Sequence, residues 1–226
     1  MPVPIDPQVE TPLDRSHFGL PGDVFLFFFA FDFMSYFERK NPLAVIEAFG
    51  RAFQSGEDAL LLIKSSNGHR FPEHARRMKD AAEKLSVRFI DDYLQKNEMR
   101  NLLRLCDCYV SLHRSEGFGL SIAEAMGFAK PVIATAYSAN VDYMNSDNGL
   151  LVRHDLVEIE ADVGPYARGQ LWADPDIEQA ASHMQRVYGD ADFAAALGRR
   201  AQQDVQRDLS YERVGERIRR RLESLK

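Results

Sequence analysis

The feature that most constrains the fold is a glycine-punctuated segment, residues 115–127, that lies between two short apolar runs. It has the sequence Ser-Glu-Gly-Phe-Gly-Leu-Ser-Ile-Ala-Glu-Ala-Met-Gly, with Cys-Tyr-Val-Ser-Leu before it at 108–112 and Pro-Val-Ile-Ala-Thr after it at 131–135. This order predicts a strand, a turn, a helix and a strand, which together place a helix N-terminus at the carboxyl edge of a parallel sheet. The free N–H groups and positive dipole of a helix start favour an anion, and Gly117 and Gly119 let the backbone approach it. The segment therefore predicts a phosphate-binding turn.

Two carboxylates, Glu116 and Glu124, frame this turn. One lies in the turn itself and the other about two helical turns further on, near the same face. Carboxylates next to an anion site suit hydroxyl groups better than the phosphate itself. The pattern indicates a ligand that carries both phosphate and hydroxyl groups.

The remaining chain repeats the alternation of apolar runs and amphipathic segments. The run 24–31 is apolar on both faces, as a central strand of a parallel sheet is, and further strands are expected at 59–63, 87–90, 108–112, 131–135 and 149–152. Helices are expected from Asn41-Pro42 onward, at 72–85, at 97–105, in a short segment at 138–144, and from Asp176 to the end. Residues 32–40 and 155–172 are expected to be irregular. We therefore predict an α/β fold, a doubly wound, Rossmann-like parallel sheet of about six strands with helices on both faces and a helical C-terminal tail.

The domain organisation follows from proline content and length. Residues 1–22 contain five prolines and no apolar period, which indicates a linker or an extended arm. Residues 23–226 are expected to form one domain, since a chain of 226 residues with 45% hydrophobic side chains can bury one large core. The arginines of the last segment, 211–225, are expected to form a solvated face, with a partner domain as a possible neighbour.

Composition narrows the classes of function. A formal charge of -6 and a pI near 5.6 argue against a general nucleic-acid binder. No apolar stretch approaches the roughly 20 residues that span a bilayer, and the first residues lack the pattern of a signal peptide. We therefore expect a cytoplasmic protein without a membrane span, and association with a membrane surface stays open. Cys106 and Cys108 are expected to pack in the core, because no further Cys or His stands at ligand spacing.

Basic residues follow the predicted strands at the same edge of the sheet. Arg39 and Lys40 come after the first strand, Lys64 ends the second, and His113 follows the fourth. Lysines that converge on a helix N-terminus would make a diphosphate pocket. The alternative for Arg39 and Lys64 is a solvated surface position, and for His113 it is a structural role or the polar lining of a pocket rather than a base. Neither a G-x-G-x-x-G after the first strand nor a P-loop is present, which argues against an ordinary dinucleotide-binding domain.

These motifs together resemble a known family. The E-x7-E signature from Glu116 to Glu124, with Ser115, Ala125-Met126 and the run 131–135, resembles the C-terminal, nucleotide-sugar-binding domain of GT-B retaining glycosyltransferases of group 1, the family 4 type. The resemblance extends over about residues 23–152 and more loosely over the C-terminal helices. It implies that residues 23–226 are the donor-binding half of an enzyme whose N-terminal acceptor domain is absent from this chain.

The resemblance also implies roles for individual residues. It implies that Glu124 accepts hydrogen bonds from the ribose, that Glu116 contacts hydroxyls of the donor sugar, and that Lys40 contacts the diphosphate. It further implies that the backbone of the turn approaches the diphosphate and the sugar, and that the loop near Tyr93 and Leu94 contacts the base; the turn residues are Gly117, Phe118, Gly119 and Leu120.

The sequence departs from the family at one position of the phosphate site. The family places Gly-Arg after the first strand, whereas Phe31-Asp32 stands here, so Arg39 or Lys64 is expected to replace the arginine.

The activity implied by the resemblance is that of a hexosyltransferase-like enzyme. It would bind a nucleoside-diphosphate sugar and, with the N-terminal domain, transfer the glycosyl group with retention of configuration, whereas the fragment alone is expected to be inactive. We expect no cofactor and no metal, because a lysine, a second cation and the helix dipole can stabilise the leaving phosphate. The alternatives are a stand-alone nucleotide-binding or regulatory module, a nucleotide-sugar epimerase, and a phosphorylase of the same architecture.

Overall fold

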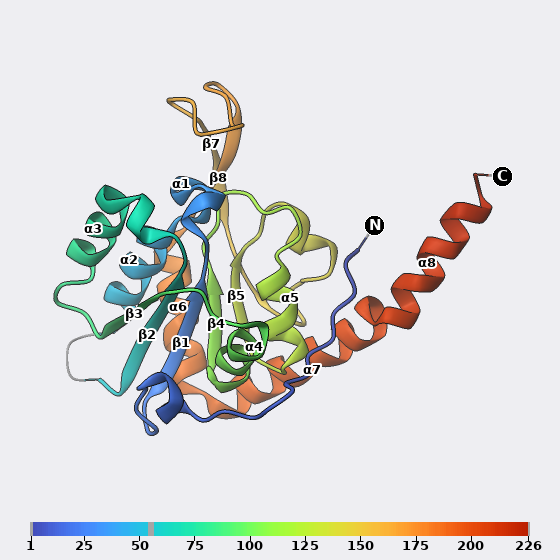
Figure 1. Cartoon of the computed structure of the whole chain (residues 1–226), viewed down its shortest axis with the longest axis horizontal. Coiled ribbons are helices and arrows are strands. Elements are labelled where there is room, and N and C mark those ends of the chain that lie inside the picture. The colour runs from blue at the N-terminus through green and yellow to red at the C-terminus, as the bar shows by residue number, and fades with distance from the viewer. Residues whose placement is uncertain (1, 54–56, 226) are drawn as a thin grey trace.

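Six parallel strands form the central sheet of the computed structural model, which describes residues 2–53 and 57–225 (Figure 1). The strand order is β3-β2-β1-β4-β5-β6, so the order reverses between β1 and β4. A reversal of this kind opens a crevice at the carboxyl ends of the two strands, where α/β proteins bind ligands. The strands are β1 (Phe25–Ala30), β2 (Ala59–Ser65), β3 (Val87–Asp91), β4 (Cys108–Ser111), β5 (Val132–Thr135) and β6 (Leu150–Val152).

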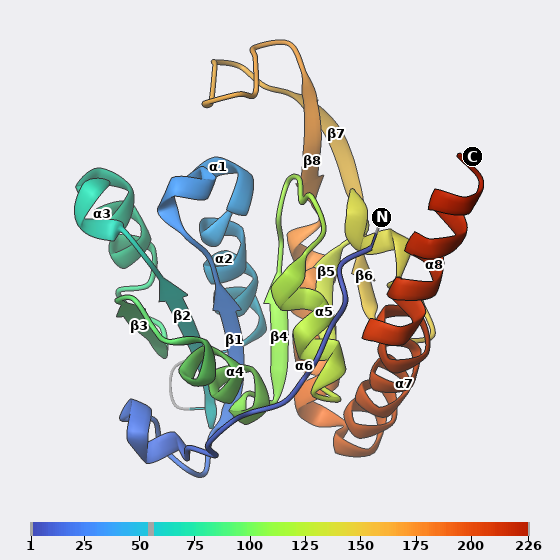
Figure 2. The same ribbon diagram turned by 45° about the vertical axis from the view of Figure 1, so that its right-hand side comes forward.

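Helices cover both faces of this sheet, which confirms the predicted doubly wound α/β architecture (Figure 2). On one face α2, α3 and α6 bury their apolar sides, and on the other α4, α5 and most of α7 do so. The α-helices are α1 (Phe37–Lys40), α2 (Pro42–Ala52), α3 (Pro72–Ala81), α4 (Lys96–Leu105), α5 (Leu120–Gly127), α6 (Ile177–Gly189), α7 (Ala191–Leu209) and α8 (Tyr211–Glu223). Short 3-10 helices are η1 (Arg15–Phe18), η2 (Phe33–Ser35), η3 (Gly68–Arg70) and η4 (Ala139–Asp142).

The aromatic run of β1 explains why this strand lies in the centre. Phe27 and Phe29 point into the core formed with α2 and α6, while Leu26 and Phe28 point into the core formed with α4 and α5. All four side chains are almost completely buried. A strand that buries both faces must be apolar at every position, and that is what the sequence provides.

The prediction that residues 155–172 are irregular is confirmed for the connection 159–170 but wrong for the residues on either side of it. They form most of an antiparallel hairpin of β7 (His154–Glu158) and β8 (Leu171–Pro175), which rises above the carboxyl edge of the sheet (Figures 1 and 2). Pairs such as Val157 with Trp172 join the two strands. The Gly164-Pro165 pair, which signals a loop in the sequence, lies at the tip of the hairpin, between the bridged residues Val163 and Tyr166. The strands were missed because 12 residues separate them, far more than in a tight hairpin turn.

Smaller differences concern the ends of elements. The expected loop 32–40 contains η2 and α1, and the helix expected at 72–85 ends at Ala81. The short segment expected at 138–144 contains η4. Cys106 and Cys108 are buried thiols in the core, as predicted, and burial raises the pKa of the Cys106 thiol to about 12.

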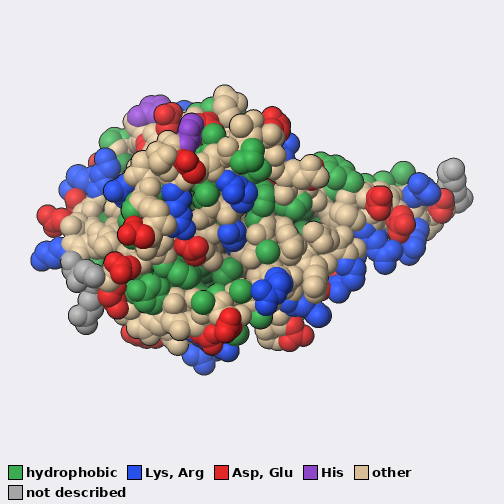
Figure 3. Space-filling model, turned by 90° about the horizontal axis from the view of Figure 1, so that it is seen from below, with side chains coloured by type: hydrophobic (Ala, Val, Ile, Leu, Met, Phe, Trp, Pro, Cys, Tyr) green, Lys and Arg blue, Asp and Glu red, His purple; other side chains and the backbone are tan. Residues whose placement is uncertain are grey.

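The C-terminal helix α8 extends away from the body, and charged side chains cover much of it (Figures 1 and 3). Its arginines are exposed, as expected for a solvated face, and several pair with Glu216 or Asp208. In the described part of the chain, no helix combines the length and the apolar character needed to cross a membrane.

The N-terminal arm runs along the surface of the domain and includes η1. Its side chains Ile5 and Leu20 are buried and join the core formed with α4, α5 and α7. The side-chain amides of Asn97 and Asn101 on α4 both donate to the Thr11 carbonyl of the arm, at 3.0 and 2.9 Å. The arm is therefore docked along most of its length, and its role as a linker to another domain stays a prediction.

Candidate functional site

The phosphate-binding turn predicted from the sequence lies at the crevice between β1 and β4. Helix α5 begins at Leu120, and its first N–H groups have no partner within the helix. Gly119 caps this helix in the left-handed conformation, with φ of 80°. A Cβ atom at Gly119 would lie 2.7 Å from the Tyr143 hydroxyl, so the position requires glycine.

Two side chains that the sequence analysis did not single out hold this turn in place. The Tyr143 hydroxyl lies 2.8 Å from the Phe118 carbonyl and 2.9 Å from the Gly119 carbonyl. Ser138 accepts a hydrogen bond from the Glu116 N–H at 2.9 Å and donates one to the Glu116 carbonyl at 2.6 Å. Both come from the segment after β5, and nothing in their spacing marks them as neighbours of the turn. The turn is therefore fixed before any ligand binds.

A cavity of about 110 Å³ opens beside the N-terminus of α5. The ammonium group of Lys40 and the carboxylate of Glu116 line it, together with the first residues of α5 and the end of β1. The lining residues are Phe29, Ala30, Lys40, Tyr109, Ser111, Glu116, Gly119, Leu120, Ser121 and Ile122.

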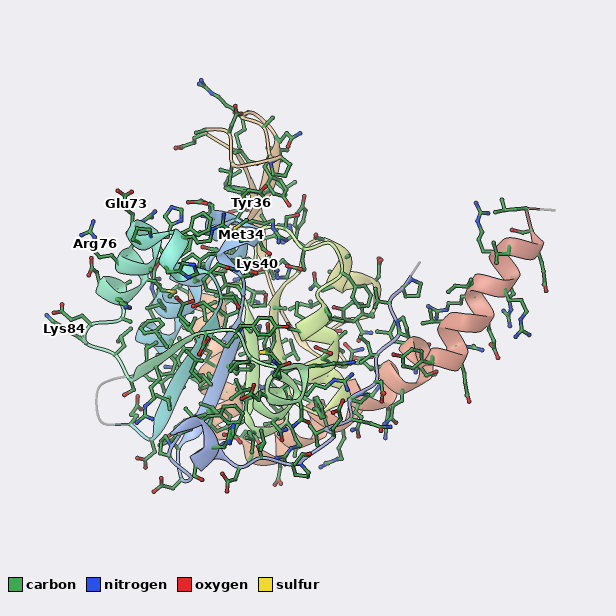
Figure 4. All side chains as sticks on the ribbon, in the orientation of Figure 1. Met34, Tyr36, Lys40, Glu73, Arg76 and Lys84 are labelled. Carbon is green, nitrogen blue, oxygen red and sulfur yellow. The ribbon has the colours of Figure 1, made fainter. Side chains whose placement is uncertain are left out.

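Two cations meet Glu116 at this cavity. Lys40 Nζ donates to Glu116 Oε2 at 2.6 Å, and Arg39 Nη1 lies 3.4 Å from the same oxygen. Arg39 also donates to the carbonyls of Ser115, at 3.0 Å, and Ser35, at 2.9 Å. Lys40 lies at the upper edge of the sheet near Met34 and Tyr36 in Figure 4. The structure thus brings together Arg39, Lys40 and Glu116, three of the residues predicted from sequence.

Lys64 lies outside this cavity. Its ammonium group is buried at the end of β2 and donates to Ser66 Oγ at 2.6 Å. Burial lowers the pKa of Lys64, and the negative charges of Asp32, Asp91 and Asp92 oppose that effect. The lysine is thus surrounded by polar and acidic groups at the β2 end of the sheet.

His113 is completely buried and joins two loops. Its Nδ1 lies 3.0 Å from Ser111 Oγ, and its Nε2 lies 3.1 Å from the Tyr137 carbonyl and 3.2 Å from Asn140 Oδ1. Burial lowers the pKa of His113, so the neutral ring is favoured. These contacts fit the structural alternative, in which His113 fixes the loop after β4 against the segment after β5.

Glu124 lies next to α4 and does not line the Lys40 cavity. Its Oε1 lies 4.0 Å from Arg100 Nε, and its side chain is 19% exposed. Burial raises the pKa of Glu124, and the charges of Arg100 and Lys96 oppose this shift. Leu94, in the loop after β3, is partly buried against the core on the same face of the sheet as α4.

Two aspartates outside the site cap helices. Two Asp-x-Asp sequences occur, and in each of them one aspartate is the N-cap of a helix: Asp176 caps α6 and Asp190 caps α7. Across residues 2–53 and 57–225, no group of three or more His, Cys, Asp or Glu side chains is placed to hold a metal ion.

The structure resembles known glycosyltransferases at low sequence identity. Sucrose-phosphate synthase from Thermosynechococcus elongatus matches with a TM-score of 0.71 and 20% identity over 99% of this chain and 51% of that enzyme. Anabaena HepE in complex with UDP matches with a TM-score of 0.71 and 16% identity over 93% of this chain and 51% of that protein. This chain thus spans about half the length of these two proteins.

A third similar structure is a separate domain. The C-terminal domain of LpcC, a glycosyl transferase group 1 family protein from Francisella tularensis, matches with a TM-score of 0.66 and 21% identity over 91% of this chain and 98% of that domain. At these identities the three likenesses show a shared fold.

The family itself is shown by sequence. A search of curated proteins finds no match. The family model described as "Glycosyl transferases group 1" matches residues 26–163, which is more than half of the chain and includes all but the first residue of β1, as well as Arg39, Lys40, the turn and α5. The chain therefore belongs to the glycosyl transferases group 1 family.

Proposed function

We propose that this chain binds a nucleoside-diphosphate sugar at the N-terminus of α5 and, with an N-terminal acceptor domain, transfers the glycosyl group with retention of configuration. The observation that carries the proposal is the Lys40–Glu116 pair, at 2.6 Å, beside the free N–H groups at the start of α5. It places a cation for phosphate and a carboxylate for hydroxyl groups in one cavity. HepE, which has the same fold, is described in complexes with UDP and with UDP-glucose.

In this proposal Arg39 takes the place of the arginine that the family has after its first strand. Its guanidinium approaches the same Glu116 oxygen as Lys40 does, so both cations face one point. Lys64, the other candidate, is held by Ser66 and lies near three aspartates, which leaves its charge partly neutralised. Arg39 and Lys40 together can compensate the charge of a diphosphate.

Glu116 holds the two cations until the donor arrives. When a diphosphate binds, Lys40 exchanges the carboxylate for a phosphate oxygen, and Glu116 becomes free to accept hydrogen bonds from the sugar. A carboxylate is an acceptor only, and it therefore suits hydroxyl donors.

The reaction breaks the bond between the anomeric carbon and the phosphate oxygen, and the electron pair stays on the phosphate. The acceptor hydroxyl forms the new bond on the same face of the sugar, and its proton passes to the departing phosphate. Lys40, Arg39 and the positive end of α5 stabilise the negative charge that develops on the leaving group. These groups can stabilise that negative charge without a metal ion or another cofactor.

The remaining contacts extend from this cavity along the crevice. Glu124 would accept hydrogen bonds from the ribose, while the backbone of residues 117–120 would lie against the diphosphate and the sugar. The loop that contains Leu94 would contact the base. His113 would support the site by fixing the loop that leads to Glu116.

Calorimetry with uridine, guanosine, adenosine and cytidine diphosphates tests the binding step. We expect one of them to bind, and we expect Lys40→Gln and Glu124→Ala to weaken that binding about tenfold or more. Lys79→Gln, at an exposed position on α3, is the matched control for Lys40 and should leave binding unchanged. Absence of binding, or equal binding by all variants, would refute the proposed site.

A second measurement tests transfer. The chain is joined to the acceptor domain of a related group 1 enzyme and assayed for transfer of sugar to that enzyme's acceptor. Nucleotide binding without any transfer by the joined protein would favour the stand-alone nucleotide-binding module instead.

A further inference from the structure

The N-terminal arm and the proposed ribose-binding carboxylate meet at one side chain, Arg100. This residue lies in the middle of α4, between the arm on one side and α5 on the other. Helices α4 and α5 pack against each other, and the arm crosses the end of α5 closely, because a Cβ at Gly127 would lie 3.0 Å from Pro7 Cβ. The arm, α4 and α5 thus form one packed unit on this face of the sheet.

One nitrogen of the Arg100 guanidinium is hydrogen-bonded to the arm, and another has no partner. Its Nη1 donates to the Gln8 carbonyl at 3.0 Å. Its Nε lies 4.0 Å from Glu124 Oε1 and, in the part of the chain that the structure describes, has no hydrogen-bond partner although it is buried. The side chains of Arg100 and Glu124 are 12% and 19% exposed, so water does little to screen the two charges from each other. A buried N–H without an acceptor is costly, and the nearest oxygen of opposite charge belongs to Glu124.

We propose that Arg100 is a positioning residue for Glu124, and that the docked arm holds Arg100 in place so that its Nε–H directs the Glu124 carboxylate toward the ribose hydroxyls. This inference rests on the proposed function. In it, the 4.0 Å gap between Nε and Oε1 closes to a hydrogen bond when the nucleotide is bound. Residues 2–13, as part of the arm, then support donor affinity without touching the donor.

The charges around Glu124 fit this role. Burial alone raises the pKa of its carboxyl group, which would favour the protonated form. Arg100 is the largest opposing influence and Lys96, one turn earlier on α4, is the next. Helix α7, which also packs on α5, presents the neutral Gln202 to the Gly127 carbonyl. An ionised Glu124 can accept from both ribose hydroxyls, so the loss of Arg100 would weaken the contact in two ways.

Arg104 provides a matched control. It lies one turn further along α4 and holds the arm in a similar way, because its Nη2 donates to the Leu13 carbonyl. Its other contacts go to Asn101 Oδ1, at 3.1 Å from Nη2. Arg104→Gln therefore removes an arm contact and one positive charge from the same helix while leaving the Arg100–Glu124 pair in place.

The experiment compares ribonucleotides with their 2′,3′-dideoxy forms. Wild type, Arg100→Gln, Arg100→Lys and Arg104→Gln are titrated by calorimetry with the nucleoside diphosphate that wild type binds best and with its dideoxy analogue. We expect Arg100→Gln to lose about tenfold in affinity for the ribonucleotide and less than about twofold for the dideoxy analogue. Arg100→Lys, which keeps the charge, should recover part of the loss, and Arg104→Gln should affect both ligands equally.

A ligand-free measurement separates this inference from the proposed function. The Glu124 carboxyl group is titrated by NMR in wild type and in Arg100→Gln, where removal of the neighbouring positive charge should raise its pKa. An unchanged titration of Glu124, or equal losses for both nucleotide forms in Arg100→Gln, would overturn the inference alone. If wild type binds no nucleoside diphosphate, the proposed function fails and this inference fails with it.

Discussion

Glu116→Gln is expected to strengthen the binding of a bare nucleoside diphosphate. In the ligand-free protein the Glu116 carboxylate neutralises Lys40 at 2.6 Å and attracts Arg39 at 3.4 Å. A diphosphate must compete with that carboxylate for both cations, and it is repelled by the same negative charge after it binds. A glutamine of the same shape removes the competition and the repulsion.

The size of the effect follows from the burial of the pair. The side chains of Lys40 and Glu116 are 17% and 15% exposed. Because the pair is mostly shielded from water, its interaction free energy should be at or above the upper end of the range for exposed ion pairs, about 1 kcal/mol. That free energy corresponds to an increase in affinity of about fivefold. For the full nucleotide-sugar the gain should be smaller or absent, because the hydroxyl contacts proposed for Glu116 weaken in the same variant.

Calorimetric titration with the nucleoside diphosphate and with its sugar conjugate measures both quantities. Glu38→Gln is the matched control, because it removes the same charge from a neighbouring carboxylate that lies 3.6 Å from His74 rather than at the cavity. We expect Glu38→Gln to change neither affinity by more than about twofold, because the half-buried Glu38–His74 pair lies outside the cavity. A diphosphate affinity that falls in Glu116→Gln would refute the partner-exchange reasoning.

Three further predictions concern the support of the site, pH and metals. Tyr143→Phe removes the hydroxyl that contacts the two turn carbonyls, and we expect a loss of about 1 kcal/mol in the free energy of unfolding, measured by urea titration, together with weaker nucleotide binding. Burial lowers the pKa of His113, and of His183 on α6, below the usual 6.5. As pH falls, the unfolded chain therefore takes up these protons at a higher pH than the folded chain does, and the free energy of unfolding should fall as pH drops below about 6.5. His113→Gln should make that fall shallower in urea titrations at a series of pH values, and an unchanged slope would contradict the assignment. Nucleotide affinity, measured by calorimetry, should be the same with and without excess EDTA, and a loss on chelation would contradict metal-independent binding.

The fold was predictable because its strongest signals are local and repeated. A strand that is apolar at every position from Phe25 to Phe29 must be buried on both faces, and the alternation with amphipathic helices leaves few arrangements of the sheet. The motif from Glu116 to Glu124 identified the helix start and the family for the same reason, since all its residues lie within one short segment.

The parts that were missed depend on contacts between distant segments. Ser138 and Tyr143 fix the turn from a segment about 20 residues further along the chain, and the hairpin of β7 and β8 pairs strands across a long tip. Arg100 lies between the arm and Glu124 because α4 packs against α5 in the folded chain. Periodicity and composition do not predict such contacts, because the contacts depend on tertiary packing.

The most direct test of the central claim is a crystal structure of this chain with the nucleoside diphosphate that it binds best. We expect the diphosphate at the N-terminus of α5, with Lys40 and Arg39 on its oxygens, Glu116 released from Lys40, and the ribose hydroxyls on Glu124. A diphosphate bound elsewhere, such as at Lys64, or a Lys40–Glu116 pair left intact beside the bound ligand, would contradict it.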